Sequence, residues 1–206
     1  MYRAGAHQGF SALRARALRF CSDRRGVAAI EFAFIVPILL IMYFITMEAS
    51  QAIETSKKVS RIGSTVADLV TQQTSVVKAD LDAIMKIGTS TLQPYTRSKP
   101  SITITAIQVT DETTPKVQVV WSRKLDGTTY GVGAAKDTIT TVPTTLKVRG
   151  TFLIRVESNL AYQPVIAWSA DNTKATGLTT AFSNIKMGET YYLRPRRGQT
   201  LPCGDC

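Results

Sequence analysis

A single carboxylate, Glu31, lies near the start of a long apolar run that begins at Val27. A charged side chain inside a membrane segment is costly, so such a residue is a functional candidate by default. We expect Glu31 to pair with the free N-terminal amine of an adjacent subunit, which exists only if the chain is cut after Gly26. That pair would offset the cost of burying both charges and would set the axial register between packed helices, together with the neighbouring Phe32 and Pro37.

The apolar run from Val27 to Met47 has 21 residues, with Glu31 as its only charge. About 20 apolar residues span the hydrocarbon core of a bilayer. The run is too long for the core of a secretory signal and has no small-residue cleavage site at its far end, so we expect it to be retained. Pro37 removes one backbone hydrogen bond within the run and favours a kink. An ordinary signal anchor that contains Glu31 and Pro37 is the alternative interpretation.

Two cysteines near the end of the chain, Cys203 and Cys206, could form a disulfide, bind a metal or exchange electrons. Two sulfurs do not make a structural zinc site without two further ligands, so we expect no metal. Outside the cytoplasm a disulfide is favoured. It could close a local loop or join neighbouring subunits, and a redox-active pair is a third possibility.

Catalytic chemistry is poorly supported by the rest of the sequence. The only histidine, His7, lies in the basic segment before Gly26, so a chain cut there has no histidine for a triad or a general base. Asp80 and Asp82 are two residues apart and do not share a helical face, so we expect them to be solvated near a helix start. No nucleophile elbow or phosphate loop is present, and we expect a non-enzymatic protein without a cofactor.

The chain has 206 residues and a formal net charge of +10, which leaves room for one membrane segment and one modest soluble domain. Residues 1–26 carry six arginines and one aspartate. Under the positive-inside rule this basic segment stays in the cytoplasm and favours anionic lipid of the membrane. No recognition motif accompanies the arginines, so we expect no nucleic-acid partner.

After the apolar run, good helix formers continue to about Ile62, with Glu54 and Lys58 as a favourable pair one turn apart. We expect a stalk helix over residues 27–62, broken at Gly63, and a separate domain over residues 63–206. Within that domain, apolar residues repeat with helical spacing before Gly88 and Pro94, which predicts an amphipathic helix that ends there. The repeating residues are Val77, Leu81, Ile84 and Met85.

After Pro100 the pattern changes to alternation, which predicts strands. The first strand runs through Ile102, shifts phase near Ile107 at an expected bulge, and pairs with a second strand that carries Trp121 as a core anchor. We predict an exposed loop over residues 125–143, with Gly131 and Gly133 as turn residues. A further strand over residues 146–162 closed by Pro164, a polar loop over residues 168–185 and a last short strand over residues 191–193 follow. The expected fold class is α+β, with an antiparallel sheet packed on the stalk helix.

The segment from Gly26 to Ala33, with Pro37 and the apolar run, resembles the N-terminal domain of TadE/TadG-like pilus assembly proteins of the tight-adherence (Tad, Flp) system. The spacing from Gly26 to Glu31 is also the pattern of prepilin processing sites. Residues 57–62 and 65–70 are similar to the segment that follows the helix in many members. Trp121-Ser122 and the C-terminal Tyr-Leu-Arg-Pro-Arg before a cysteine pair fit the same family.

The resemblance implies a minor pilin-like subunit (a pseudopilin) of a type IVb Flp pilus. It implies an inner-membrane protein with a cytoplasmic N-terminus and a periplasmic domain, cut between Gly26 and Val27 by a prepilin peptidase. Its partners would be other pilin-like subunits and subunits of the Tad assembly platform, with Glu31 as the assembly carboxylate. The chain is too short for the adhesion-type metal-binding domain of larger members, so we place it with the small ones.

Two other interpretations compete with this one. The first is a signal-anchored envelope protein that is not processed and whose periplasmic domain binds a partner or polysaccharide. The second is a type II secretion pseudopilin, which the aromatic strands and the terminal cysteine pair favour less.

Overall fold

The computed structural model describes residues 27–164 and 185–206. The chain divides into two compact units, and the division falls between Met47 and Glu48. The first unit contributes the apolar half of one helix. The second unit, which starts at Glu48, holds the rest of that helix, a second helix and the sheet.

Helix α2 runs from Val27 to Thr71 and includes Gly63, so the expectation that the stalk helix breaks at Gly63 is wrong. A Cβ atom built on Gly63 would lie 2.8 Å from Ser158 Oγ and 2.9 Å from Tyr191 Cδ2. The glycine therefore allows the helix to approach the sheet closely. The packing gained in this way outweighs the lower helix propensity of glycine. The expected ion pair between Glu54 and Lys58 is present at 2.8 Å.

Helix α3 runs from Lys78 to Ser90, with Leu81, Ile84, Met85 and Gly88 buried. Two details of the predicted helix are wrong. Val77 precedes the helix and is exposed, and Gly88 lies inside it. A Cβ on Gly88 would meet Val66 Cγ2 at 2.6 Å, so this glycine is needed where α3 crosses α2.

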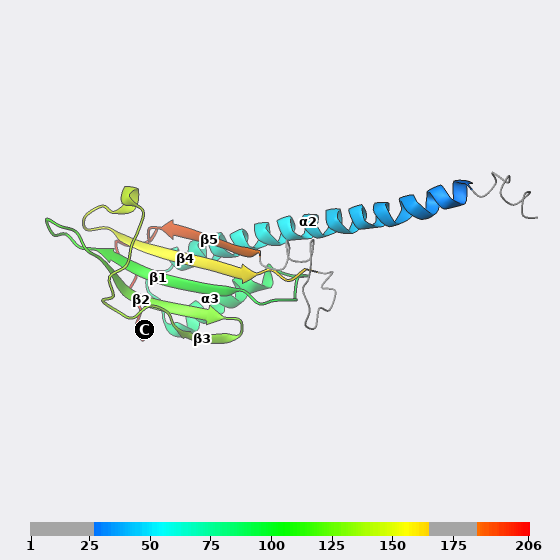
Figure 1. Ribbon diagram of the computed structural model, residues 1–206. Coiled ribbons are helices and arrows are strands. Elements are labelled where there is room, and N and C mark those ends of the chain that lie inside the picture. The colour runs from blue at the N-terminus through cyan, green and yellow to red at the C-terminus, as the bar shows by residue number, and fades with distance from the viewer. Residues whose placement is uncertain (1–26, 165–184) are drawn as a thin grey trace, which may run out of the picture. The chain divides into compact units, whose positions relative to one another are not determined.

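The sheet has five antiparallel strands in the order β3-β2-β1-β4-β5 (Figure 1). Their bounds are Ser101–Val109 for β1, Val117–Asp126 for β2, Thr129–Val132 for β3, Phe152–Ala161 for β4 and Lys186–Leu193 for β5. A short 3-10 helix, Thr144–Leu146, precedes β4. The α+β class and the antiparallel sheet are therefore confirmed.

Both helices contact the same face of the sheet. Ile102 on β1 pairs with Ser158 on β4, so their side chains point to the same side. Ser158 donates a hydrogen bond to the backbone oxygen of Val59 on α2 at 3.1 Å, while Ile102 lies 3.9 Å from a Cβ built on Gly88 of α3. This shared face holds the main hydrophobic core, and a smaller cluster on the opposite face contains Ile107, Val109, Val117 and Leu153.

The predicted bulge is confirmed by a register shift between Ala106 and Ile107, whose partners on β2 are Trp121 and Val119. Trp121 is buried, as predicted for a core anchor. The predicted loop over residues 125–143 is partly wrong, because β3 lies within it. The strand escaped prediction because its four residues are too few for a clear alternation.

Gly133 is not a turn residue of an open loop, because a Cβ built there would lie 2.2 Å from Ser122 Oγ. Pro164 follows β4 as expected, and the last strand is longer than residues 191–193. The predicted polar loop over residues 168–185 lies outside the described residues except for Ile185.

Candidate functional site

The first half of α2 presents apolar side chains to the outside on all its faces. Every residue from Val27 to Met47 is exposed or half-buried, and Phe32 is 69% exposed. The most apolar 18-residue window of α2 has a mean hydropathy of 2.4, and none of its residues is buried by the part of the chain that the structure describes. An apolar surface of this size is compatible with a single-pass membrane helix, because exposed apolar patches so large mark sites of contact with membranes or other proteins.

Glu31 is exposed on this apolar surface, one turn after Val27, where α2 begins. Residues four apart share a helical face, so a chain that began at Val27 would place its amine beside this carboxylate or beside that of a neighbour. Gly26 lies outside the described residues. The structure therefore places Val27, Glu31 and Phe32 within the first two turns of the helix, where all three are exposed.

Pro37 lies in the middle of the apolar half of α2, and the chain remains helical on both sides of it. Proline has no N–H, so the backbone oxygen of Ala33 receives no hydrogen bond from position 37. In a membrane such a freed carbonyl is satisfied by neighbouring helices, hydroxyl side chains or water. The position is exposed and thus available to a neighbouring helix.

A buried polar cluster begins with the first residue after the apolar run, Glu48. Its side chain is 3% exposed and accepts a 2.5 Å hydrogen bond from the hydroxyl of Tyr162, which is 1% exposed. Burial raises the pKa of the Tyr162 phenol, and the hydrogen bond to the Glu48 carboxylate raises it further. By its residue type, Glu48 is only one of the good helix formers that follow the apolar run. Its place directly after the last apolar residue was the one available signal.

Aromatic stacking extends this cluster. The ring of Tyr95 stacks on Tyr162 with centroids 5.7 Å apart, and the Arg97 guanidinium lies 4.7 Å from the Tyr95 centroid. Arg97 also donates to the backbone oxygen of Gln163 at 2.8 Å and to Gln51 Oε1 at 3.2 Å. These contacts tie the segment between α3 and β1 and the end of β4 to the first turns of α2 after Met47.

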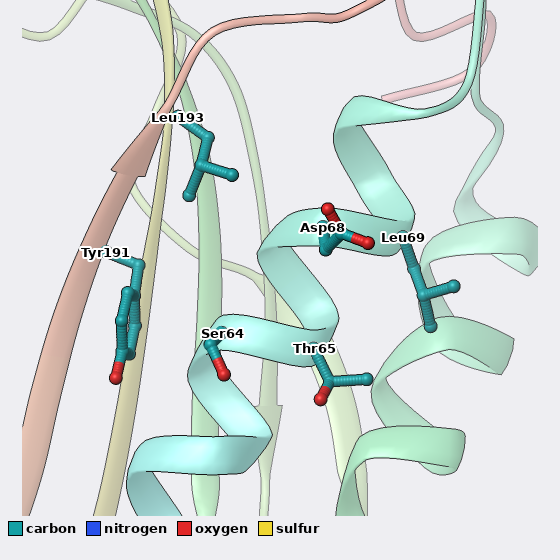
Figure 2. Close-up of a pocket in the computed structure, with 6 residues that line it drawn as sticks. All are labelled: Ser64, Thr65, Asp68, Leu69, Tyr191 and Leu193. Atoms are coloured by element: carbon teal, nitrogen blue, oxygen red, sulfur yellow. The ribbon is translucent and has the colours of Figure 1, made fainter.

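An open groove of about 460 Å³ lies between the last turns of α2 and strand β5. Figure 2 shows Tyr191 and Leu193 of β5 on one side and the α2 side chains on the other. The Tyr191 hydroxyl and the Asp68 carboxylate in this lining already have partners. Tyr191 shares a 2.6 Å hydrogen bond with Ser60, and Asp68 forms an ion pair with Arg196. The lining residues are Ser64, Thr65, Asp68, Leu69, Tyr191 and Leu193.

Cys203 and Cys206 form an intramolecular disulfide. The sequence left open whether a disulfide would close a local loop or join neighbouring subunits, and in the structure it closes a local loop. A carboxylate oxygen of Asp205 and the two sulfurs lie within 4.8 Å of one another, close enough for one metal ion to contact all three residues. Sulfurs joined in a disulfide are not thiolates, however, and thiolates are the form of cysteine that binds metals.

The two aspartates near the start of α3 have separate structural partners, so the expectation that both are simply solvated is wrong for Asp82. Its carboxylate accepts two hydrogen bonds from Arg123, at 2.8 and 2.7 Å. This contact raises the pKa of the Arg123 guanidinium. Asp80 lies in the first turn of α3 and accepts a hydrogen bond from the backbone of Val77 at 3.2 Å. The bidentate pair of Asp82 and Arg123 joins α3 to β2.

Comparison with known families identifies the N-terminal part of the chain. A family model described as TadE-like protein matches residues 26–61, which include the apolar half of α2 and the turns that follow. This match confirms the resemblance seen around Gly26 and Glu31. Searches of curated proteins and of solved structures return no match to this chain.

Proposed function

We propose that this TadE-like chain is a pseudopilin of a Tad pilus, processed after Gly26 and anchored in the inner membrane by the apolar half of α2. The observation that carries the proposal is a coincidence of two features. The family match covers residues 26–61, and this segment contains an apolar helical window without a buried residue and with one carboxylate near the start of the helix. These features fit a membrane protein related to Tad pili, and the finer role is our inference.

The distribution of buried residues supports an anchor followed by a folded domain. No residue of α2 before Glu48 is buried, whereas buried residues recur every three or four positions from there to Thr71. The first half of the helix is thus suited to lipid, and the second half belongs to a water-soluble core. With the arginine-rich N-terminal segment in the cytoplasm, the domain from Glu48 onward lies in the periplasm.

The lone carboxylate suggests why the helix would be more than an anchor. A membrane helix that serves only to anchor has no need of Glu31, and the charge opposes insertion. A mature chain that begins at Val27 supplies one cation for each anion, so packed copies satisfy both charges. The proposed role is therefore structural, in the assembly or the fibre of the pilus, and not catalytic.

The test is the N-terminus of the protein extracted from membranes. Intact mass and N-terminal sequencing are compared in cells with and without the cognate prepilin peptidase. We expect a chain that starts at Val27 only when the peptidase is present. Gly26→Ile should abolish this cleavage, whereas Gly9→Ile, a matched change within the basic segment, should leave it intact.

A chain that keeps its N-terminal segment in the presence of the peptidase would contradict the proposal. Glu31 would then be a feature of a signal anchor, and the protein would be an unprocessed envelope protein. In that case, replacing residues 27–47 by an unrelated membrane helix should preserve its function, and this second measurement separates the two roles.

A further inference from the structure

The last thirteen residues form a strap across the ends of both helices. It starts beside α2, where the backbone N–H of Arg196 donates to the oxygen of Thr71 at 2.9 Å. It then passes the sheet, where Trp121 Nε1 donates to the oxygen of Leu201 at 2.8 Å and Leu201 is completely buried. The strap ends at the start of α3.

At that end the strap pairs with the chain just before α3. The backbone N–H of Val76 donates to Pro202 at 3.0 Å, and the N–H of Gly204 donates back to Val76 at 2.9 Å. Cys203 is half-buried against the core, while Cys206 is exposed. The disulfide therefore closes the turn that carries Asp205.

Asp205 caps the start of α3 from a distant part of the chain, beside the local hydrogen bond that Asp80 accepts from the Val77 N–H. Helices usually start with Ser, Thr, Asp or Asn, whose side chain accepts a hydrogen bond from the first N–H groups. The residue at this position before α3 is Val77, which has no acceptor, and instead the Lys78 N–H donates to Asp205 Oδ1 at 2.8 Å. A carboxylate at this end also interacts favourably with the helix dipole.

We propose that oxidation of Cys203 and Cys206 to a disulfide holds Asp205 at the start of α3, so that these residues form a redox-controlled clasp. The partner of this clasp is an oxidoreductase that donates a disulfide. The disulfide restricts residues 203–206 to a turn in which Asp205 points at α3. Reduction frees that turn, so the cap and the pairing with Val76 are lost together. This inference does not depend on pilus assembly.

The chemistry is thiol–disulfide exchange. One cysteine thiolate attacks a sulfur of the donor disulfide, which forms a mixed disulfide and releases one donor thiolate. The other cysteine thiolate then attacks the mixed disulfide, which forms the Cys203–Cys206 bond and releases the second donor thiolate. The pair loses two electrons and two protons, and the donor takes up both as two thiols. In the reverse direction the exposed Cys206 is the accessible point of attack.

The experiment uses the full chain in detergent micelles, with Cys21→Ser to remove the third cysteine. Hydrogen exchange is measured after oxidation by oxidised glutathione and after reduction by dithiothreitol. We expect reduction to speed exchange at the amides of Val76, Lys78 and Gly204 by roughly five- to tenfold, the change that loss of a helix cap produces. Amides in the middle of β1 should keep their rates.

Two variants separate the parts of the clasp. Asp205→Ala with the disulfide intact should speed exchange at Lys78 and leave Val76 and Gly204 unchanged. The double variant Cys203→Ser, Cys206→Ser should exchange like the reduced protein and should not respond to dithiothreitol. Equal exchange at Val76 and Lys78 in the oxidised and reduced proteins would overturn the proposal.

Discussion

Tyr162 donates a 2.5 Å hydrogen bond to Glu48, a residue 114 positions earlier in the chain. Tyr162 follows the last residue of β4, and Glu48 follows the last residue of the apolar run. Both side chains are buried, so the hydrogen bond is shielded from water. The Tyr162 hydroxyl thus replaces the water that would otherwise hydrogen-bond to the Glu48 carboxylate. This contact joins the sheet to α2 at the point where its buried face begins.

Replacing Tyr162 by Phe removes the donor and leaves Glu48 with one hydrogen bond fewer in a buried site. We expect the free energy of unfolding to fall by about 1–3 kcal/mol, the cost of a buried polar group that loses a partner. Urea unfolding in detergent, followed by tryptophan fluorescence, measures the change. Tyr130→Phe on β3, where the tyrosine is only half-buried, should change stability much less.

The same contact predicts a loss of stability at alkaline pH. The pKa of Tyr162 is raised above its usual value of 10.0, so the unfolded chain releases this proton at a lower pH than the folded chain. The stabilisation is complete below pH 10 and falls by up to about 1.4 kcal/mol per pH unit above it. Unfolding measured between pH 8 and 11 should show the wild type losing its advantage over Tyr162→Phe. If the difference in unfolding free energy between the two proteins stayed constant over this pH range, the raised pKa of Tyr162 would be refuted.

Gly63→Ala tests close packing against helix propensity. Alanine is favoured in a helix by about 1 kcal/mol, but here its Cβ would collide with Ser158 and Tyr191, at a cost of about 1–3 kcal/mol. We expect a net loss of stability in urea unfolding. Gly131→Ala is the matched control, because a Cβ there meets nothing within 4 Å. If Gly63→Ala were more stable than the wild type, α2 and the sheet would be shown to move apart easily at this contact.

The pair of Asp82 and Arg123 should be energetically coupled, because both side chains are largely buried and share two hydrogen bonds. A double-mutant cycle with alanine at both positions should give a coupling of about 1–3 kcal/mol. The exposed pair of Lys124 and Asp126, also 2.7 Å apart, should give less than about 1 kcal/mol. Equal coupling in the two cycles would contradict the importance of burial here.

Glu31→Gln tests the proposed assembly carboxylate. It removes the charge and keeps the shape, so membrane insertion should be retained while a buried pair with an N-terminal amine is lost. Breaking such a pair costs about 3–5 kcal/mol, so we expect at least a tenfold loss of assembled pili by electron microscopy. Glu54→Gln is the control, since Glu54 is exposed on the same helix and pairs with Lys58. Normal assembly by Glu31→Gln would rule out a register role for this residue.

Much of the fold could be predicted, because it depends on periodic patterns within short segments. Alternation identified β1, β2 and β4, and the phase change at Ile107 correctly located the bulge. The length of the apolar run identified the membrane-type helix. The two errors at Gly63 and Gly88 share one cause. Local propensity treats glycine as a helix breaker, whereas each glycine here lies where two packed elements approach too closely for a side chain.

The sequence by itself determined the fold class, the exposed apolar helix and its one carboxylate, since each follows from residue types and their spacing along a few turns or strands. Only the tertiary structure decided which polar residues meet. Tyr162 reaches Glu48, Arg123 reaches Asp82, and Asp205 caps a helix that begins 127 residues earlier. Such pairs depend on which faces of the helices and the sheet pack together, and no local pattern encodes that choice.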